Sequence, residues 1–141
     1  SNQSYYDKAA ELFTKSSDKS IKVFADGSLI DFSKYDNVLP VIKENRTLIP
    51  VRALVESLGG NVDWDSSRSL ITITLGDKVV KLTLNSDTAY VNDKTTKLDI
   101  PAQTINGRTM VPLRFVSENF GKKVDWHPYT GGTSIVSVID N

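Results

Sequence analysis

The sequence contains no cysteine and a single histidine, His127. Without cysteine, the chain cannot use thiol catalysis, hold an iron–sulfur cluster or build a Cys-type zinc site. With one imidazole, it cannot form a site that requires two histidine ligands. It also lacks an apolar run long enough to cross a bilayer, so we expect no membrane insertion. Its 17 basic and 17 acidic residues cancel, which argues against a nucleic-acid surface, because such surfaces depend on clustered Lys and Arg.

What the sequence does have is many β-branched residues and several tight-turn signals. Val, Ile and Thr make up 36 of 141 residues, which favours a mainly β fold. One turn signal, Gly76-Asp77, would place Ile73 opposite Val80 and Ile71 opposite Leu82, so that the apolar faces of both strands coincide. Three more such turns are Asp26-Gly27, Asn92-Asp93 and Asn106-Gly107. These signals predict a series of antiparallel hairpins.

The first twenty residues differ from the rest. Tyr5, Ala9, Leu12 and Phe13 have the spacing of one helical face, and a polar linker follows them up to residue 20. We interpret residues 1–20 as the tail of an upstream region. The alternative is an amphipathic membrane anchor, which is less favoured because the helix is short and has no basic face.

A block of the sequence occurs twice, at a spacing of 62 residues. Residues 46–64 align without a gap to residues 108–126, and nine of the nineteen aligned positions are identical. Most of the other positions exchange one apolar residue for another. The domain at 21–141 is therefore predicted to contain two repeats, at about 21–84 and 85–141.

Each copy of the block is predicted to be a strand, a short helix and a second strand. Pro50 and Pro112 suit the start of a helix, where a missing N–H costs nothing. Gly59 and Gly121 suit the left-handed cap just past its end. We expect helices at about 52–58 and 114–120. The fold class that follows is α+β, mainly antiparallel β, with two similar lobes that are each a twisted sheet wrapped around one short helix.

The duplicated block carries charged residues that we interpret as a structural clamp. Arginine in the first turn of a helix opposes the helix dipole, so a carboxylate must offset it. The glutamate one turn later and the aspartate of the following strand are the candidates. The clamp residues are Arg52, Glu56 and Asp63 in the first copy, and Arg114, Glu118 and Asp125 in the second.

Candidate binding residues lie at the end of each copy. Trp64 and Trp126 could be platforms for stacking sugars. They could equally be core residues, and their place on the same strand face as Val62 and Val124 favours burial on the helix side. The loop from His127 to Thr133, which contains Tyr129, is the best site candidate, although a plain connection between strands is the simpler interpretation. The candidate binding residues are thus Trp126, His127 and Tyr129. We expect no metal, because one imidazole beside one acid falls short of the ligands that zinc requires.

The duplicated Arg-Thr-Leu-Ile-Pro-Val-Arg signature, with its Val-Asp-Trp ending, resembles the copper amine oxidase N-terminal-like domain, also called the stalk domain. The resemblance covers about residues 21–140. It implies an extracellular accessory module of the cell envelope, common in secreted proteins of Firmicutes, with the signal peptide outside this sequence. No catalytic residue carries over. We expect no copper binding, no amine oxidase activity and no cofactor, because only His127 and Met110 could supply imidazole or sulfur ligands.

Two functions remain in competition. The first is a non-catalytic structural spacer or binding module, with cell-wall polysaccharide or neighbouring domains of the parent protein as partners. The second is a small carbohydrate-active or cell-wall hydrolase that uses paired carboxylates. Such an enzyme needs two acids converging in a cleft, yet Glu56 and Glu118 are expected to be engaged by arginines. The binding module is therefore the preferred hypothesis.

Overall fold

The computed structural model describes residues 2–15, 18–129 and 134–141. Three sheets and three α-helices make up the described part of the chain, and nearly all strand pairs are antiparallel, so the α+β class is confirmed. Four of the elements are helical. They are α1 (Asn2–Thr14), the 3-10 helix η1 (Phe32–Tyr35), α2 (Val51–Ser57) and α3 (Leu113–Asn119).

The largest sheet is a meander of five antiparallel strands. Its order is β5 (Asn61–Asp65), β6 (Leu70–Leu75), β7 (Lys78–Thr83), β8 (Thr88–Val91) and β9 (Lys94–Lys97). The predicted pairs of the first turn are observed, with Ile73 opposite Val80 and Ile71 opposite Leu82. Each of these side chains is buried, because the pleat directs alternate residues to the helix side of the sheet.

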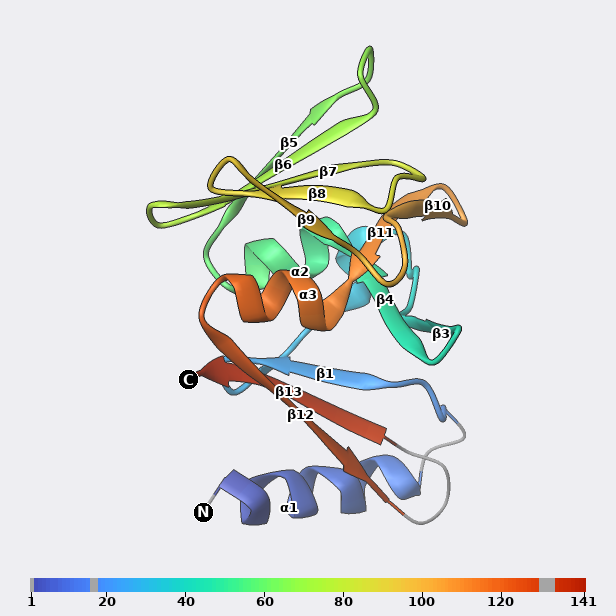
Figure 1. The fold of residues 1–141 in the computed structure, drawn as a ribbon. Helices are drawn as coiled ribbons and strands as arrows, with labels where there is room; N and C mark the ends of the chain where they lie inside the picture. Colours follow the sequence, from blue (N-terminus) through green and yellow to red (C-terminus); the bar gives the residue numbers. More distant parts are fainter. Residues whose placement is uncertain (1, 16–17, 130–133) are drawn as a thin grey trace.

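A second, four-stranded sheet has the order β12 (Lys122–Pro128), β13 (Ser134–Asp140), β1 (Lys22–Ala25) and β2 (Ser28–Leu29). The β1–β13 pair is parallel and joins the beginning of the domain to its end. In Figure 1, α2 and α3 lie between this sheet and the five-stranded sheet, and α1 covers the outer face of β12 and β13.

The third sheet is built around the two entering strands of the duplicated block. Its order is β10 (Gln103–Ile105), β11 (Arg108–Pro112), β4 (Arg46–Pro50) and β3 (Val41–Lys43). Ile49 stands directly opposite Val111, and these two residues are 62 positions apart. The ladder therefore has an approximate two-fold axis at this pair, because replacing each residue by its counterpart 62 positions away in the other copy turns the pair Pro50–Met110 into the pair Pro112–Leu48.

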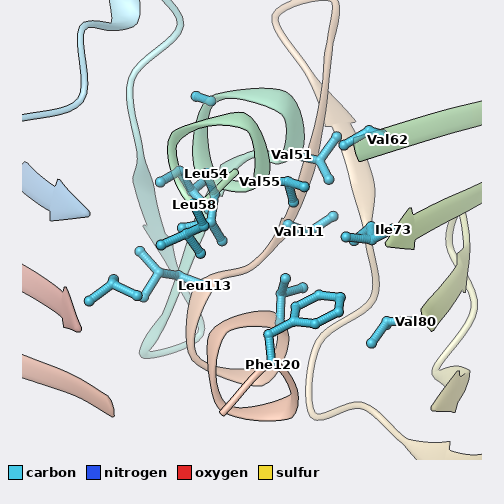
Figure 2. Close-up of a cluster of buried hydrophobic side chains, with 14 of the residues drawn as sticks. Val51, Leu54, Val55, Leu58, Val62, Ile73, Val80, Val111, Leu113 and Phe120 are labelled. Atoms are coloured by element: carbon cyan, nitrogen blue, oxygen red, sulfur yellow. The ribbon is translucent and has the colours of Figure 1, made fainter. Parts of the chain in front are cut away.

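One hydrophobic core serves both copies of the block. Leu54 of α2, Leu113 of α3 and Phe120 just after α3 belong to the same buried cluster (Figure 2). The expectation of two lobes, each with its own wrapped sheet, is therefore corrected. Because β4 pairs with β11, both helices are brought under the same sheets and share their burial.

The local helix signals act as expected at the C-terminal ends. Gly59 and Gly121 take φ values of 84° and 76°, which place them in the left-handed region that favours glycine. The two prolines sit one position earlier than expected, as N-cap residues of helices that begin at residues 51 and 113.

Helix α1 buries a different face from the one that the spacing predicted. Tyr6 and Ala10 are buried against Phe24 and Ile135, whereas Leu12 is 75% exposed. Only a narrow stripe of a short helix meets a flat sheet, and the stripe through Tyr6 and Ala10 carries the larger aromatic contact. Among the described residues, no helix has the length and apolar character needed to cross a membrane.

Candidate ligand-binding grooves

Two grooves open at the N-terminal ends of α2 and α3. Each is lined by the start of one helix, by the tryptophan of the strand that follows it, and by the first residues of the entering strand from the other copy. We call the groove at Trp64 the first groove and the groove at Trp126 the second groove. Their cavity volumes are ≈ 250 Å³ and ≈ 520 Å³.

The linings of the two grooves correspond residue by residue. Six lining positions have the same residue type in both grooves at a spacing of 62, four of them in the helix start and the following strand and two in the entering strand. The pairs are Pro50 and Pro112, Arg52 and Arg114, Val62 and Val124, Trp64 and Trp126, Arg108 and Arg46, and Thr109 and Thr47.

The register of the central sheet explains why each groove is built from both copies. Strands β4 and β11 run antiparallel, so the first residues of β11 lie beside the last residues of β4, where α2 begins. Arg108 thereby reaches the groove of Trp64, and Arg46 reaches the groove of Trp126.

An arginine–aspartate pair stands in each groove. In the first groove, Arg108 holds Asp36 with 2.8 Å between Nη2 and Oδ2 and 3.0 Å between Nε and Oδ2. In the second groove, Arg46 holds Asp99 with corresponding distances of 3.1 Å and 3.3 Å. Both carboxylates are largely exposed and line the groove in which they lie. Each groove thus presents fixed hydrogen-bond donors and acceptors side by side.

The tryptophans are not core residues, so the preference for burial was wrong. Trp64 is 43% exposed and Trp126 is 37% exposed. The expected strand face is right, because Val62 and Val124, which share that face with the tryptophans, are buried on the helix side. Each helix has only seven residues, a length of about 10 Å, and its first turn already contacts the valine. The tryptophan, two residues farther along the strand, therefore projects past the end of the helix.

The helix arginines fasten each helix to its following strand. Nη1 of each arginine donates to the backbone carbonyl of the buried valine, at 3.3 Å in the first copy and 3.2 Å in the second. Each arginine also pairs with the glutamate one turn later, Arg52 with Glu56 at 3.7 Å and Arg114 with Glu118 at 3.4 Å. These pairs are solvent-exposed, so the ion pairs themselves stabilise the fold by about 1 kcal/mol at most.

The two aspartates of the expected clamp have other partners. Asp63 accepts a hydrogen bond from the Asn61 amide at 3.3 Å, and Asp125 pairs with Lys123 at 3.4 Å. Both aspartates lie between a buried valine and an exposed tryptophan, on the opposite face of the strand from the arginine. The clamp is thus a contact of arginine with glutamate and a carbonyl oxygen.

The expected binding residues lie on two different faces of the chain, because side chains alternate along β12. Trp126 lines the second groove, whereas His127 and Tyr129 face α1. The His127 ring stacks on Tyr6 with 4.7 Å between centroids, and its Nε2 lies 3.0 Å from the Ser137 hydroxyl. The three residues do not form one site. The remainder of the expected loop, residues 130–133, lies outside the described residues.

Tyr129 attaches α1 to the end of β12. Its hydroxyl donates to Asp7 at 2.8 Å. Burial, followed by the hydrogen bond to Asp7, raises the pKa of Tyr129 to about 12. Hydrogen bonds from Gln3 and Tyr129 lower the pKa of Asp7. This network holds a helix, and its groups are engaged with one another.

Among the described residues, no three or more His, Asp or Glu side chains are grouped so that they could hold a metal ion. The residues of the chain from 24 to 135 match the family described as the copper amine oxidase N-terminal domain. The chain belongs to this family. The match spans both copies of the block, both helices and both grooves, and the domain of this family is a non-catalytic stalk domain.

Sequence reasoning gave no role to the groove arginines or to their acids. Arg46 and Arg108 did carry a signal, because they are identical residues at the same position of the duplicated block. Asp36 and Asp99 lie outside that block and had no comparable signal. Their place in the grooves depends on the pairing of β4 with β11, which brings distant segments together.

Proposed function

We propose that this chain is a non-catalytic accessory module of an exported bacterial protein, and that it binds cell-wall polysaccharide at the cell envelope. The observation that carries the proposal is the exposure of Trp64 and Trp126 at equivalent places, each in a groove. A large aromatic side chain left in water forgoes the burial that would stabilise the fold. Sugar rings have apolar faces that can cover an indole and recover this burial.

The frame around each tryptophan supports a binding role. Both tryptophans lie on strands in continuous ladders, with Trp64 opposite Ile71 and Trp126 opposite Val136. The arginine of the adjacent helix fixes the carbonyl two residues earlier. A platform held in this way loses little conformational entropy on binding, which favours affinity.

The charges of the grooves support binding over hydrolysis. A glycosidase needs a carboxylic acid whose pKa is raised so that it can protonate the leaving group. In the second groove, Asp99 is paired with Arg46 and Glu118 with Arg114, so both carboxylates already have a cationic partner. In the described part of the chain, the acids with a clearly shifted pKa all have it lowered, chiefly by hydrogen bonds from neighbouring side chains. These acids are Asp7, Asp18, Asp31, Asp65 and Asp87.

Sedimentation with purified bacterial sacculi that retain their wall polysaccharide tests the proposal. The variants are Trp64→Ala, Trp126→Ala and the double substitution. Tyr90→Ala is the matched control, since Tyr90 is an aromatic residue with 42% exposure on β8, outside both grooves. We expect the wild type and the control to sediment alike, each single variant to bind at least several-fold less, and the double variant to stay in solution.

A parallel assay follows the release of reducing sugar from the same sacculi. We expect none above background for the wild type. Equal sedimentation of the wild type and the double tryptophan variant would overturn the binding role. Release of reducing ends that disappears in the glutamate variant Glu118→Gln would instead favour the hydrolase.

A further inference from the structure

We propose that the two grooves are two separate subsites for a pyranose ring with vicinal hydroxyl groups. Each is completed beside the tryptophan by an arginine from the other half of the chain and by the aspartate that pairs with this arginine. This inference rests on the proposed function and adds to it the chemistry of the ligand, the stoichiometry and the composition of each subsite. Both indoles and both pairs belong to the groove linings.

The equivalence of the grooves follows from the sheet between them. Ile49 and Val111 face each other on the approximate two-fold axis of the ladder. Helices α2 and α3 directly follow β4 and β11, and the strands that carry the two tryptophans directly follow these helices, so the same order of elements leads from the axis to each tryptophan. Arg108 and Asp36 are paired at 2.8 Å in one groove, and Arg46 and Asp99 at 3.1 Å in the other. The same combination of platform and pair is thus built twice.

The pairs match the hydrogen-bonding needs of a diol. A guanidinium group only donates hydrogen bonds and a carboxylate only accepts them, whereas a sugar hydroxyl does both. Two adjacent hydroxyl groups can therefore engage a paired arginine and aspartate at once. Asp36 and Asp99 are exposed enough to accept from a ligand without leaving their arginines. An acetamido group in place of one hydroxyl keeps an N–H donor but removes the oxygen acceptor at that carbon, which the arginine would use, and it adds bulk.

The two subsites differ in size. The second groove has a volume of ≈ 520 Å³ against ≈ 250 Å³ for the first. Its additional lining includes Leu98, Ile100 and Phe115, which are apolar, and Lys97. A larger apolar wall buries more of a sugar chain, so we expect the second groove to bind an oligosaccharide more tightly than the first.

The two tryptophans allow each groove to be followed alone, because the chain has no others. In Trp126→Phe, the fluorescence reports the first groove, and in Trp64→Phe it reports the second. The probes are cellohexaose and chitohexaose, which share ring and linkage and differ at C2, where the hydroxyl is replaced by an acetamido group. We expect both reporters to respond to cellohexaose with saturation, and to respond at least tenfold more weakly to chitohexaose.

Substitution of the aspartates tests the composition of each subsite. Asp36→Asn keeps a residue that tolerates the left-handed conformation found there, with φ of 59°. We expect it to weaken the response of Trp64 at least tenfold and to leave that of Trp126 unchanged, and Asp99→Asn to do the reverse. Asp77→Asn, at the β6–β7 turn outside both grooves, is the control and should change neither response.

The outcomes separate this inference from the proposed function. A response from one tryptophan only would refute the two subsites, and unchanged responses in both aspartate variants would refute the role of the pairs. Tighter binding of chitohexaose, or a response to wall stem peptides but to neither sugar, would refute the diol chemistry. Except for the stem-peptide result, which would also contradict polysaccharide as the ligand, these outcomes leave the proposed function standing if the wild type sediments with sacculi and the double tryptophan variant does not. Absence of wild-type sedimentation, or equal sedimentation of the double tryptophan variant, would overturn the function.

Discussion

Replacing Tyr6 with alanine should release α1 from the domain while leaving the main core folded. Tyr6 is 3% exposed and is enclosed by Phe24, by Ile135 and by the stacked ring of His127. This cluster is separate from the core that α2 and α3 share. The helix can therefore detach as a unit, and the substitution acts on its attachment more than on the rest of the fold.

The magnitude follows from the burial. Truncating a large buried aromatic side chain to alanine costs about 3–5 kcal/mol. The lower end applies here, about 3 kcal/mol, because the partner surface can close over the gap once the helix moves. Tyr5→Ala is the matched control. Tyr5 is half exposed, and its main polar contact is one hydrogen bond to the carbonyl of Gly27 at 2.9 Å, so its loss costs about 1 kcal/mol.

Amide hydrogen exchange measures the attachment directly. A loss of 3 kcal/mol lowers the protection of the α1 amides by about 100-fold, because 1.4 kcal/mol corresponds to a factor of ten. The amides of β6 and β7 should keep their protection in both variants. Equal effects of Tyr5→Ala and Tyr6→Ala would refute the reasoning, as would a global loss of protection that includes the five-stranded sheet.

Three further predictions concern pH, the clamp and one glycine. The neutral Tyr129 hydroxyl donates to Asp7, and its pKa of about 12 lies above the usual 10. The contribution of this hydrogen bond to stability is therefore complete below pH 10 and is lost as the pH rises toward 12. Over this interval, the far-UV circular dichroism of Tyr129→Phe should change less than that of the wild type. Arg114→Ala should destabilise by about 1 kcal/mol in guanidinium unfolding, well below the cost of a buried clamp, because its glutamate partner stays in solvent. Gly60→Ala should cost about 1–3 kcal/mol in the same assay, because the added Cβ would lie 2.8 Å from Val55 Cγ1 and 2.8 Å from the backbone oxygen of Thr74 in β6.

The hairpins could be predicted because their information is local. A two-residue turn fixes the register of the strands on either side, and the pairing of Ile73 with Val80 follows from the position of Gly76-Asp77 alone. The helices of the block were predicted to within one residue for a similar reason, since a proline and a glycine mark their ends. These features depend on neighbours in the sequence.

The exposure of the tryptophans could not be read from alternation. The two-residue period of a strand predicts which face each side chain occupies, and Val62 and Trp64 do share a face. This period does not predict how far the covering helix extends along that face. Similarly, the spacing in α1 allowed two adjacent stripes, and only contact with Phe24 and Ile135 selected the one through Tyr6.

The parallel pairing of β1 with β13 had no local signal at all. Lys22 lies opposite Ile135, which is 113 residues later, so no turn specifies the register. The pairing depends on the whole fold, which brings the first strand of the domain beside the last. The same limit applies to Asp36 and Arg108, whose contact joins segments 72 residues apart.

The grooves show how a duplicated sequence can encode a site that neither copy contains. Within one copy, the whole entering strand separates Arg46 from the start of the helix, and Trp64 and Arg46 line different grooves. The antiparallel pairing of β4 with β11 brings the arginine of the other copy to the start of the helix, so Trp64 shares a groove with Arg108. A substitution near one tryptophan and a substitution in the other copy therefore act on the same groove. Alignment of the copies identifies the residue types of the site, and only the pairing of the two strands shows how they combine.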